Sequence, residues 1–244
     1  MKLKGIKIGL ILIILSIASG CMFPQEELAK NKIPNEAQLD MVQEAVMQYQ
    51  EETDGLLPIK TKPSDAPIYE KYLIDFTMLK ERQLITETPG TAYENGGVYQ
   101  YSIVTPDEDP RVKLIDLRIT EAVRSVHVKL DTYRSKNLYP PFGDEIEKGL
   151  YKVNYEKLGM KAPPEIISPF TQNALPIVMN TDGELYVDYR IDLQQALDEY
   201  DHSFKEGDDI RSILVDNHPF VPAYSLAYTI EDDEVVFLET SIND

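Results

Sequence analysis

The chain has 244 residues, of which 42 are acidic and 24 are basic, and its formal net charge is −18. This charge argues against nucleic acid and anionic lipid headgroups as partners of the chain as a whole, because binding to both depends on clustered lysine and arginine. A single cysteine in the whole chain also excludes an internal disulfide.

The first 20 residues have the pattern of a bacterial signal peptide. Three lysines precede an apolar stretch over 8–17, which suits a signal h-region and is shorter than the roughly 20 apolar residues of a membrane span. The next four residues, Ala18-Ser19-Gly20-Cys21, resemble the lipobox of bacterial lipoproteins. This resemblance implies cleavage between Gly20 and Cys21 and attachment of fatty acid, such as palmitate, through Cys21.

A lipid at Cys21 would hold the protein on the extracytoplasmic face of the cell membrane. Two or three acyl chains suffice, since each buried methylene contributes about 0.8 kcal/mol. Residues 21–33 are mostly polar and would then act as a flexible tether spanning roughly 20 Å on average. The folded part is expected to begin at residue 34.

Apolar spacing predicts a first helix over 36–53, with Asn35 as its N-cap and Gly55 beyond its end. The turn residues of 95–97, Asn-Gly-Gly, precede a β-rich stretch over 98–104 and predict a hairpin at this point. A polar loop over 105–110 and a short strand over 112–115 follow.

A second helix is predicted over 119–136 from the same helical spacing. A third begins at about Asp192, which forms a capping box with Gln195 in this interpretation. Turn residues at 180–183 and 232–233 predict hairpins before and after that helix, and residues 224–238 are expected to close the fold as a hairpin.

These elements predict an α+β fold, with mainly antiparallel short sheets and three principal amphipathic helices. After each of the first two helices come tyrosine, leucine and proline residues and then Tyr-Glu-Lys, at 69–71 and 155–157. One interpretation is a pair of related α+β units, 34–117 and 118–244. Chance similarity between two amphipathic helices followed by prolines is the alternative.

No common catalytic motif occurs in the chain, so an enzyme is not the favoured interpretation and no catalytic residue is assigned. His127 and His202 are interpreted as structural; Asp198 is spaced to pair with His202. The stretch 216–224 contains two stiffening prolines among polar and aromatic residues, as binding loops on rigid scaffolds do. Its candidate binding residues are Asp216, Asn217, His218 and Tyr224.

Acidic clusters at 107–109, 206–209 and 231–234 lack the ligand spacing of a dedicated calcium loop. We interpret them as solvated loops and expect neither a metal nor a cofactor. The fifteen tyrosines are only a weak indication of a peptide or glycan groove, because tyrosines at helical spacing more often border a core.

Several local sequences are similar to those of one lipoprotein family. They are the lipobox, Leu-Leu-Pro-Ile over 56–59, Tyr-Glu-Lys over 69–71 and Glu-Asn-Gly-Gly-Val-Tyr over 94–99. Together they resemble a YphF-like lipoprotein family of Bacillus-type bacteria, over nearly the whole chain. Members have sometimes been labelled binding proteins of ABC transporters, a label that transfers no ligand and no catalytic residue.

Three functions are therefore weighed. The favoured one is a lipid-anchored binding or accessory lipoprotein that holds a small molecule, a peptide or a protein partner near the membrane. A solute receptor of an ABC transporter is the second, and it predicts two lobes of parallel βα units. A carboxylate-based hydrolase is the third, and it predicts two carboxyl groups that converge in one pocket.

Overall fold

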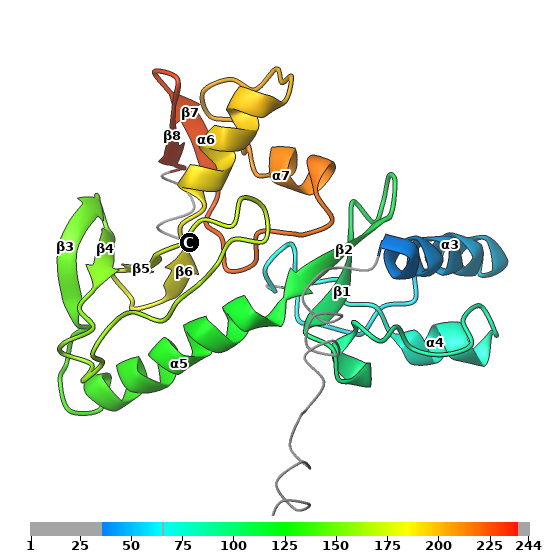
Figure 1. The fold of residues 1–244 in the computed structure, drawn as a ribbon, viewed down its shortest axis with the longest axis horizontal. Coiled ribbons are helices and arrows are strands. Elements are labelled where there is room, and N and C mark those ends of the chain that lie inside the picture. Colours follow the sequence, from blue (N-terminus) through cyan, green and yellow to red (C-terminus); the bar gives the residue numbers. More distant parts are fainter. Residues whose placement is uncertain (1–35, 65, 239–244) are drawn as a thin grey trace, which may run out of the picture.

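The computed structural model describes residues 36–64 and 66–238 (Figure 1). The predicted signal peptide, the lipidation and cleavage site at Gly20 and Cys21, the tether and the Asn35 cap all lie outside the described residues. None of the helices in the described part of the chain is long and apolar enough to cross a membrane.

The first elements along the chain are two helices, a short 3₁₀ turn and a β-hairpin. Their bounds are α3 Glu36–Glu52, α4 Phe76–Glu81, η1 Tyr93–Asn95, β1 Tyr99–Val104 and β2 Arg111–Asp116. The first predicted helix and both predicted strands are confirmed, whereas α4 was not predicted because six residues carry too little periodicity. Strands β1 and β2 pair antiparallel along their whole length.

The hairpin predicted at 95–97 is wrong in position, because those residues lead into β1 and the partner strand comes after β1. Gly96 adopts the left-handed conformation, with φ +81°, and ends η1. A Cβ atom on Gly97 would lie 2.1 Å from the backbone of Thr91. The two glycines therefore allow the backbone just before β1 to turn and to lie close to the backbone of Thr91.

Irregular segments extend this hairpin into a wider sheet. On the β1 side, the Ile74 amide donates to the Tyr101 carbonyl over 2.9 Å, and the Ile103 amide donates to Tyr72. On the β2 side, the Leu114 amide donates to the Pro219 carbonyl over 2.9 Å, so residues 219–221 run parallel to β2. A segment from late in the chain thus becomes the edge of an early sheet.

The remaining elements lie after Asp116. They are α5 Leu117–Arg134, β3 Phe142–Glu147, β4 Leu150–Val153, β5 Ile177–Asn180, β6 Leu185–Val187, α6 Arg190–Glu199, α7 Ser212–Asn217, β7 Tyr228–Glu231 and β8 Glu234–Phe237. Strands β3 to β6 form one antiparallel sheet in sequence order, and β7 and β8 form a separate hairpin.

The hairpins predicted at 180–183 and 232–233 are confirmed. Asp232 and Asp233 both have positive φ, +48° and +67°, as a two-residue type I′ turn requires. Strands β3 and β4 and helix α7 were not predicted. The sequence of β3, Phe-Gly-Asp-Glu-Ile-Glu, contains glycine and three acids, which depress any β-propensity signal.

The same three-residue pattern, Asp-x-Arg, occurs at the starts of helices α5, α6 and α7, at 116–118, 188–190 and 209–211. In each copy the aspartate accepts from the backbone amide of the arginine, over 2.9 to 3.1 Å, and its carboxylate also binds that arginine's guanidinium. These contacts satisfy an amide that a helix start would otherwise leave unpaired.

The predicted capping box of Asp192 and Gln195 is therefore wrong, since α6 begins two residues earlier, at Arg190. Asp192 is fully buried and accepts hydrogen bonds from the Ser168 and Thr171 hydroxyls. Burial raises the pKa of Asp192, and the two hydroxyl donors oppose that rise. The carboxyl organises the loop at 168–173 rather than the helix end.

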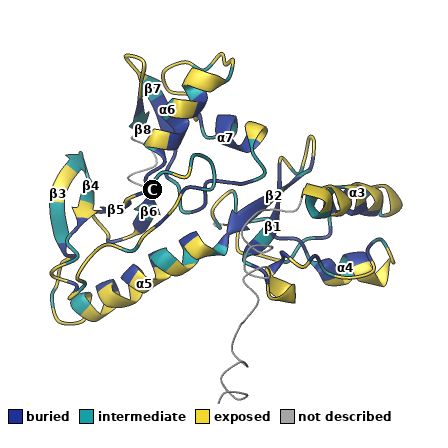
Figure 2. Ribbon diagram, viewed as in Figure 1, coloured by how far each residue is buried: buried dark blue, intermediate teal, exposed yellow. Residues whose placement is uncertain are grey.

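Three clusters of buried apolar residues make up the core (Figure 2). One joins α3, α4, β1 and β2 and includes Phe220. The largest joins α5, the four-stranded sheet, α6 and the β7–β8 hairpin. The smallest contains Val104, Val215 and Val221.

This arrangement confirms the α+β class with mainly antiparallel sheets. The three principal helices are α3, α5 and α6. The division into related units at residue 117 stays a prediction.

Candidate functional site

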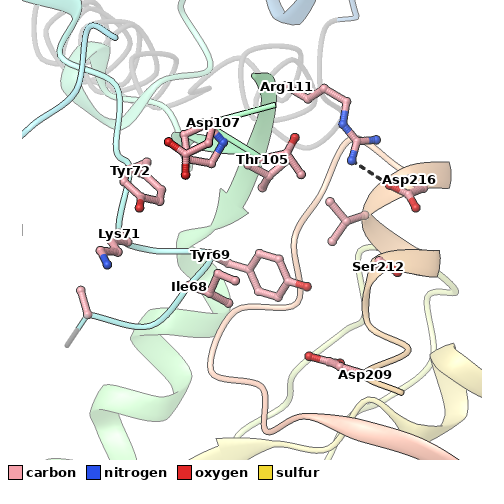
Figure 3. A pocket seen from close by; sticks show the side chains of 14 residues that line it. Ile68, Tyr69, Lys71, Tyr72, Thr105, Asp107, Arg111, Asp209, Ser212 and Asp216 are labelled. Atoms are coloured by element: carbon pink, nitrogen blue, oxygen red, sulfur yellow. Dashed lines mark ion pairs between the residues drawn. The ribbon is translucent and has the colours of Figure 1, made fainter. Parts of the chain in front are cut away.

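A pocket of about 600 Å³ lies where three segments meet: 66–72, the β1–β2 turn and residues 209–216, which include most of α7 (Figure 3). This volume is within the range of about 300 to 1,000 Å³ of small-ligand sites. The apolar part of its wall is formed by Ile68, Tyr69, Tyr72, Val104 and Val215. Two of these segments belong to the early sheet and one to the second half of the chain.

The Tyr69 side of the pocket is held by a chain of contacts. The Arg211 guanidinium lies 5.4 Å from the centroid of the Tyr69 ring, and it binds both oxygens of Asp209. The Tyr69 carbonyl accepts from the Ser102 hydroxyl over 2.8 Å. Burial raises the pKa of Tyr69 to about 12, against the lowering effect of Arg211. Tyr69 therefore stays neutral and is positioned before any ligand arrives.

The polar rim of the pocket carries both signs of charge. Arg111 from β2 and Asp216 from α7 form an ion pair of 2.8 Å across it, with side chains 33 % and 47 % exposed (Figure 3). Lys71 and Asp107 also line the pocket, and within the described residues neither has an ion-pair partner. A ligand with charged groups could replace water on both of these side chains.

Of the four predicted binding residues, the pocket contains only Asp216. Asn217 ends α7 and donates from its side chain to the Ile213 carbonyl over 2.8 Å. Tyr224 adopts a left-handed backbone, with φ +56°, and its carbonyl accepts from the Val187 amide. The stretch 219–223 pairs with β2 and packs in the core, so most of the predicted loop links the two halves of the molecule.

His218 lies in an aromatic corner outside the pocket. Its ring meets Phe170 and Tyr200 edge-on, at centroid distances of 5.4 and 6.0 Å, and its carbonyl accepts from Lys113. Burial and the positive charge of Lys113 lower the pKa of His218, and Glu199 opposes this effect. The imidazole is thereby biased to the neutral form.

The other two histidines lie on the surface. His127 faces Asp131 along α5 at 3.6 Å, with both side chains more than half exposed. His202 stacks on Phe204 at 5.7 Å, and α6 ends at Glu199, so Asp198 and His202 do not share a helix face. Among the described residues no group of three or more His, Cys, Asp or Glu side chains is placed to hold a metal ion.

Two of the three aspartates that line the pocket are engaged in ion pairs, and the third, Asp107, has no ion-pair partner among the described residues. Asp209 and Asp216 line the same pocket but bind Arg211 and Arg111, respectively. A retaining or inverting hydrolase needs one carboxyl as acid and another as base or nucleophile. Asp209 and Asp216 are each held by a different arginine.

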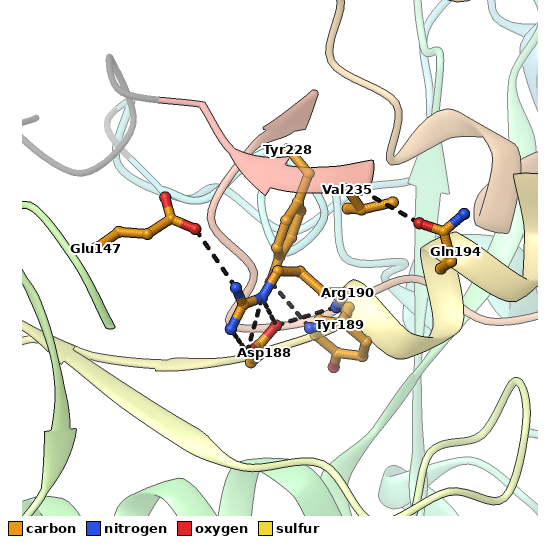
Figure 4. Close-up of polar contacts among 7 residues, drawn as sticks. All are labelled: Glu147, Asp188, Tyr189, Arg190, Gln194, Tyr228 and Val235. Atoms are coloured by element: carbon orange, nitrogen blue, oxygen red, sulfur yellow. Dashed lines mark hydrogen bonds and ion pairs between the residues drawn. The ribbon is translucent and has the colours of Figure 1, made fainter. Parts of the chain in front are cut away.

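A second polar cluster surrounds Arg190 at the start of α6 (Figure 4). Arg190 binds Asp188 and Glu147, the latter over 3.4 Å, and its guanidinium lies 4.6 Å from the ring centroid of Phe237. Tyr228 donates to the Val187 carbonyl and accepts from the Tyr189 amide. These groups fasten α6 and the β7–β8 hairpin to the four-stranded sheet, and their role is structural.

Sequence reasoning missed most of the pocket, including Tyr69, Tyr72 and Arg111. The one available signal was a concentration of aromatic residues beside two prolines at 63 and 67. That signal places a loop but not its partners, because the opposite wall comes from α7, far along the chain.

Part of the chain matches the model of a known protein family. Residues 35–116 match the YphF family N-terminal domain, a range that extends from the start of α3 to the end of β2. Comparison with curated proteins and with solved structures gave no match. The predicted resemblance to a YphF-like family is thus supported over these residues.

Proposed function

Starting from a first segment similar to the YphF family N-terminal domain, we propose that this chain is a binding lipoprotein of the extracytoplasmic membrane face, without catalytic activity. In this proposal the lipid is carried by Cys21, as the lipobox of Bacillus-type lipoproteins implies. The binding site is the pocket between 66–72, the β1–β2 turn and α7.

The observation that carries the binding role is the construction of this pocket. Its tyrosine wall is prepositioned by Arg211 and its rim is closed by the Arg111–Asp216 ion pair. Preorganised side chains favour binding, because less conformational freedom is lost when a ligand is held.

The ligand class follows from the lining. Tyrosine, valine and isoleucine side chains suit an apolar or aromatic body, and the charges of Lys71 and Asp107, which form no ion pair among the described residues, suit polar ends. A short peptide or a small amphipathic molecule has both features.

Thermal unfolding in the presence of amino acids, short peptides, sugars and wall fragments tests this proposal. A ligand at one hundred times its Kd stabilises the native state by about 2.7 kcal/mol. The decisive comparison uses Ile68→Ser, which removes an exposed apolar side chain of the pocket, and Leu56→Ser, which removes a similarly exposed one outside it.

We expect Ile68→Ser to reduce the ligand-induced rise in Tm and Leu56→Ser to leave it unchanged. If both variants keep the full rise, the ligand binds elsewhere. If no compound raises the Tm of the parent protein, a protein partner becomes the favoured occupant, and crosslinking in cells is the next measurement.

The anchor is tested separately from the pocket. Metabolic labelling with palmitate should mark the parent chain and fail with Cys21→Ser, since Cys21 is the single cysteine. In membrane fractionation, the variant should be found in the soluble fraction. Equal labelling of both chains would refute the lipid at Cys21 without bearing on the pocket.

A further inference from the structure

The loop after α5 presents two apolar side chains to solvent. Leu138 is fully exposed and Tyr139 is 56 % exposed. The loop is nevertheless ordered by its own contacts: the Asn137 amide and side chain both donate to the Tyr133 carbonyl, and the Tyr139 ring packs edge-on against Tyr133 at 6.5 Å. We call residues 137–139 the tip.

The segment that contains the tip carries a net positive formal charge, although acidic residues at 121 and 144–145 flank it directly. Residues 123–143 hold four basic side chains and one acidic one, in a protein where acids outnumber bases 42 to 24. The acidic one, Asp131, faces His127, and Arg124 pairs with Glu121. Three exposed cations have no ion-pair partner among the described residues: Lys129, Arg134 and Lys136.

Exposed apolar side chains beside unpaired cations suit the surface of an anionic membrane. Leucine and tyrosine enter the boundary between lipid headgroups and acyl chains, where tyrosine is enriched. Lysine and arginine near an anionic leaflet add attraction that falls off within about a Debye length. An acidic protein surface, including that of a second copy of this chain, would also attract these cations, and the test below separates it from lipid.

The geometry points to the tip as a second membrane contact, made to anionic lipid headgroups. The inference depends on the proposed anchor in one respect only: the anchor decides which side of the membrane the tip can reach. Helix α3, which follows the predicted tether, and the C-terminal end of α5 lie at opposite ends of the longest axis (Figure 1). Figure 2 shows the outer face of α5 as exposed.

The chain contains no tryptophan, so Leu138→Trp introduces a single fluorescent reporter at the tip. A chain beginning at Cys21 keeps every core cluster of the described residues. Its single thiol can be coupled to maleimide lipid in vesicles, which replaces the natural anchor and makes the test independent of lipidation in cells. Emission is measured with and without brominated acyl chains, in phosphatidylcholine alone and with phosphatidylglycerol added.

We expect a blue shift and bromine quenching of tryptophan at position 138 in the phosphatidylglycerol vesicles, and weaker quenching in phosphatidylcholine alone. Lys129→Glu combined with Lys136→Glu should lower the ratio of inserted to free tip about fivefold for each cation, the factor that corresponds to the attraction of one basic residue, about 1 kcal/mol. The matched control is Ile191→Trp, on an exposed position of α6, which should not be quenched.

Three results would overturn the inference. Tryptophan at 138 could remain unquenched in anionic vesicles, or tryptophan at 191 could be quenched equally, which would mean unspecific contact. A blue shift that grows with protein concentration in the absence of lipid would show instead that a second copy of the chain covers the tip.

Discussion

At the scale of single residues, Glu70 is the least satisfied polar group of the described chain. It lies between two residues that line the pocket, yet its Oε1 is buried without a hydrogen-bond partner. Burial raises the pKa of Glu70, and the Tyr224 backbone amide and the charge of Lys62 oppose that rise. An unpaired buried acceptor costs about 1 to 3 kcal/mol, so this carboxyl destabilises the segment that forms one pocket wall.

The pH dependence follows from the direction of this shift. Because the folded pKa is raised, the contribution of Glu70 to stability is fully present below its usual value of 4.5 and is lost as pH rises through the folded pKa. Glu70→Gln is neutral at every pH, so the variant should gain stability relative to the parent as pH rises from 4.5 to 7.

Denaturant unfolding of both proteins across this pH range measures the difference in the free energy of unfolding. Glu87→Gln, at an exposed position, is the control and should show a smaller change. A difference between Glu70→Gln and the parent that stays constant with pH would contradict the assignment.

At the scale of elements, the Asp-x-Arg pattern explains how three helices begin. In each copy the arginine also lies over an aromatic ring: Arg118 over Tyr99, Arg190 over Phe237 and Arg211 over Tyr69. The planar guanidinium can bind a carboxylate and stack on a ring at once, which lysine cannot do. The pattern therefore joins each helix start to a neighbouring element.

Burial should decide how much each copy contributes. The Asp188 side chain is 7 % exposed and that of Asp209 is 39 % exposed. Asp188→Asn removes a buried charged acceptor and should reduce the free energy of unfolding by about 1.5 to 3 kcal/mol. The more exposed Asp209→Asn should cost less than about 1 kcal/mol.

Urea unfolding of the two variants provides this comparison. Equal losses would show that the contacts of α6 and α7 contribute equally despite their different exposure. A larger loss for Asp209→Asn would contradict the argument from burial.

At the scale of the whole molecule, Phe220 connects the two halves. It belongs to the core of α3, α4, β1 and β2, where it lies 5.5 Å from the Tyr99 ring, and it contacts Phe170 at 6.4 Å. The segment matched by the YphF family N-terminal domain ends at residue 116, so a residue far beyond this segment completes its core.

Phe220→Ala should therefore destabilise the entire protein, by about 3 to 5 kcal/mol. Calorimetry is expected to show one transition at a lower Tm, because both halves share this contact. Phe204→Ala is the matched control: its ring is only partly buried, and it should cost less. Two separate transitions, one of them unchanged, would show that the halves unfold independently.

The sequence by itself determined the α+β class, the three principal helices and the hairpins at 180–183 and 232–233. Helical periodicity and turn residues are local properties, so they are readable without knowledge of the partners. The capping box at Asp192 failed because a buried loop, and not the helix end, uses that carboxyl.

Only the tertiary structure decided the pocket and the link between the halves. Asp216 was a predicted binding residue, but Arg111 and Tyr69 were not, because their proximity depends on how α7 packs against the early sheet. Similarly, no local pattern indicates that 219–221 pairs with β2. Long-range pairing depends on complementary surfaces brought together by folding, and a linear pattern carries no record of which surfaces meet.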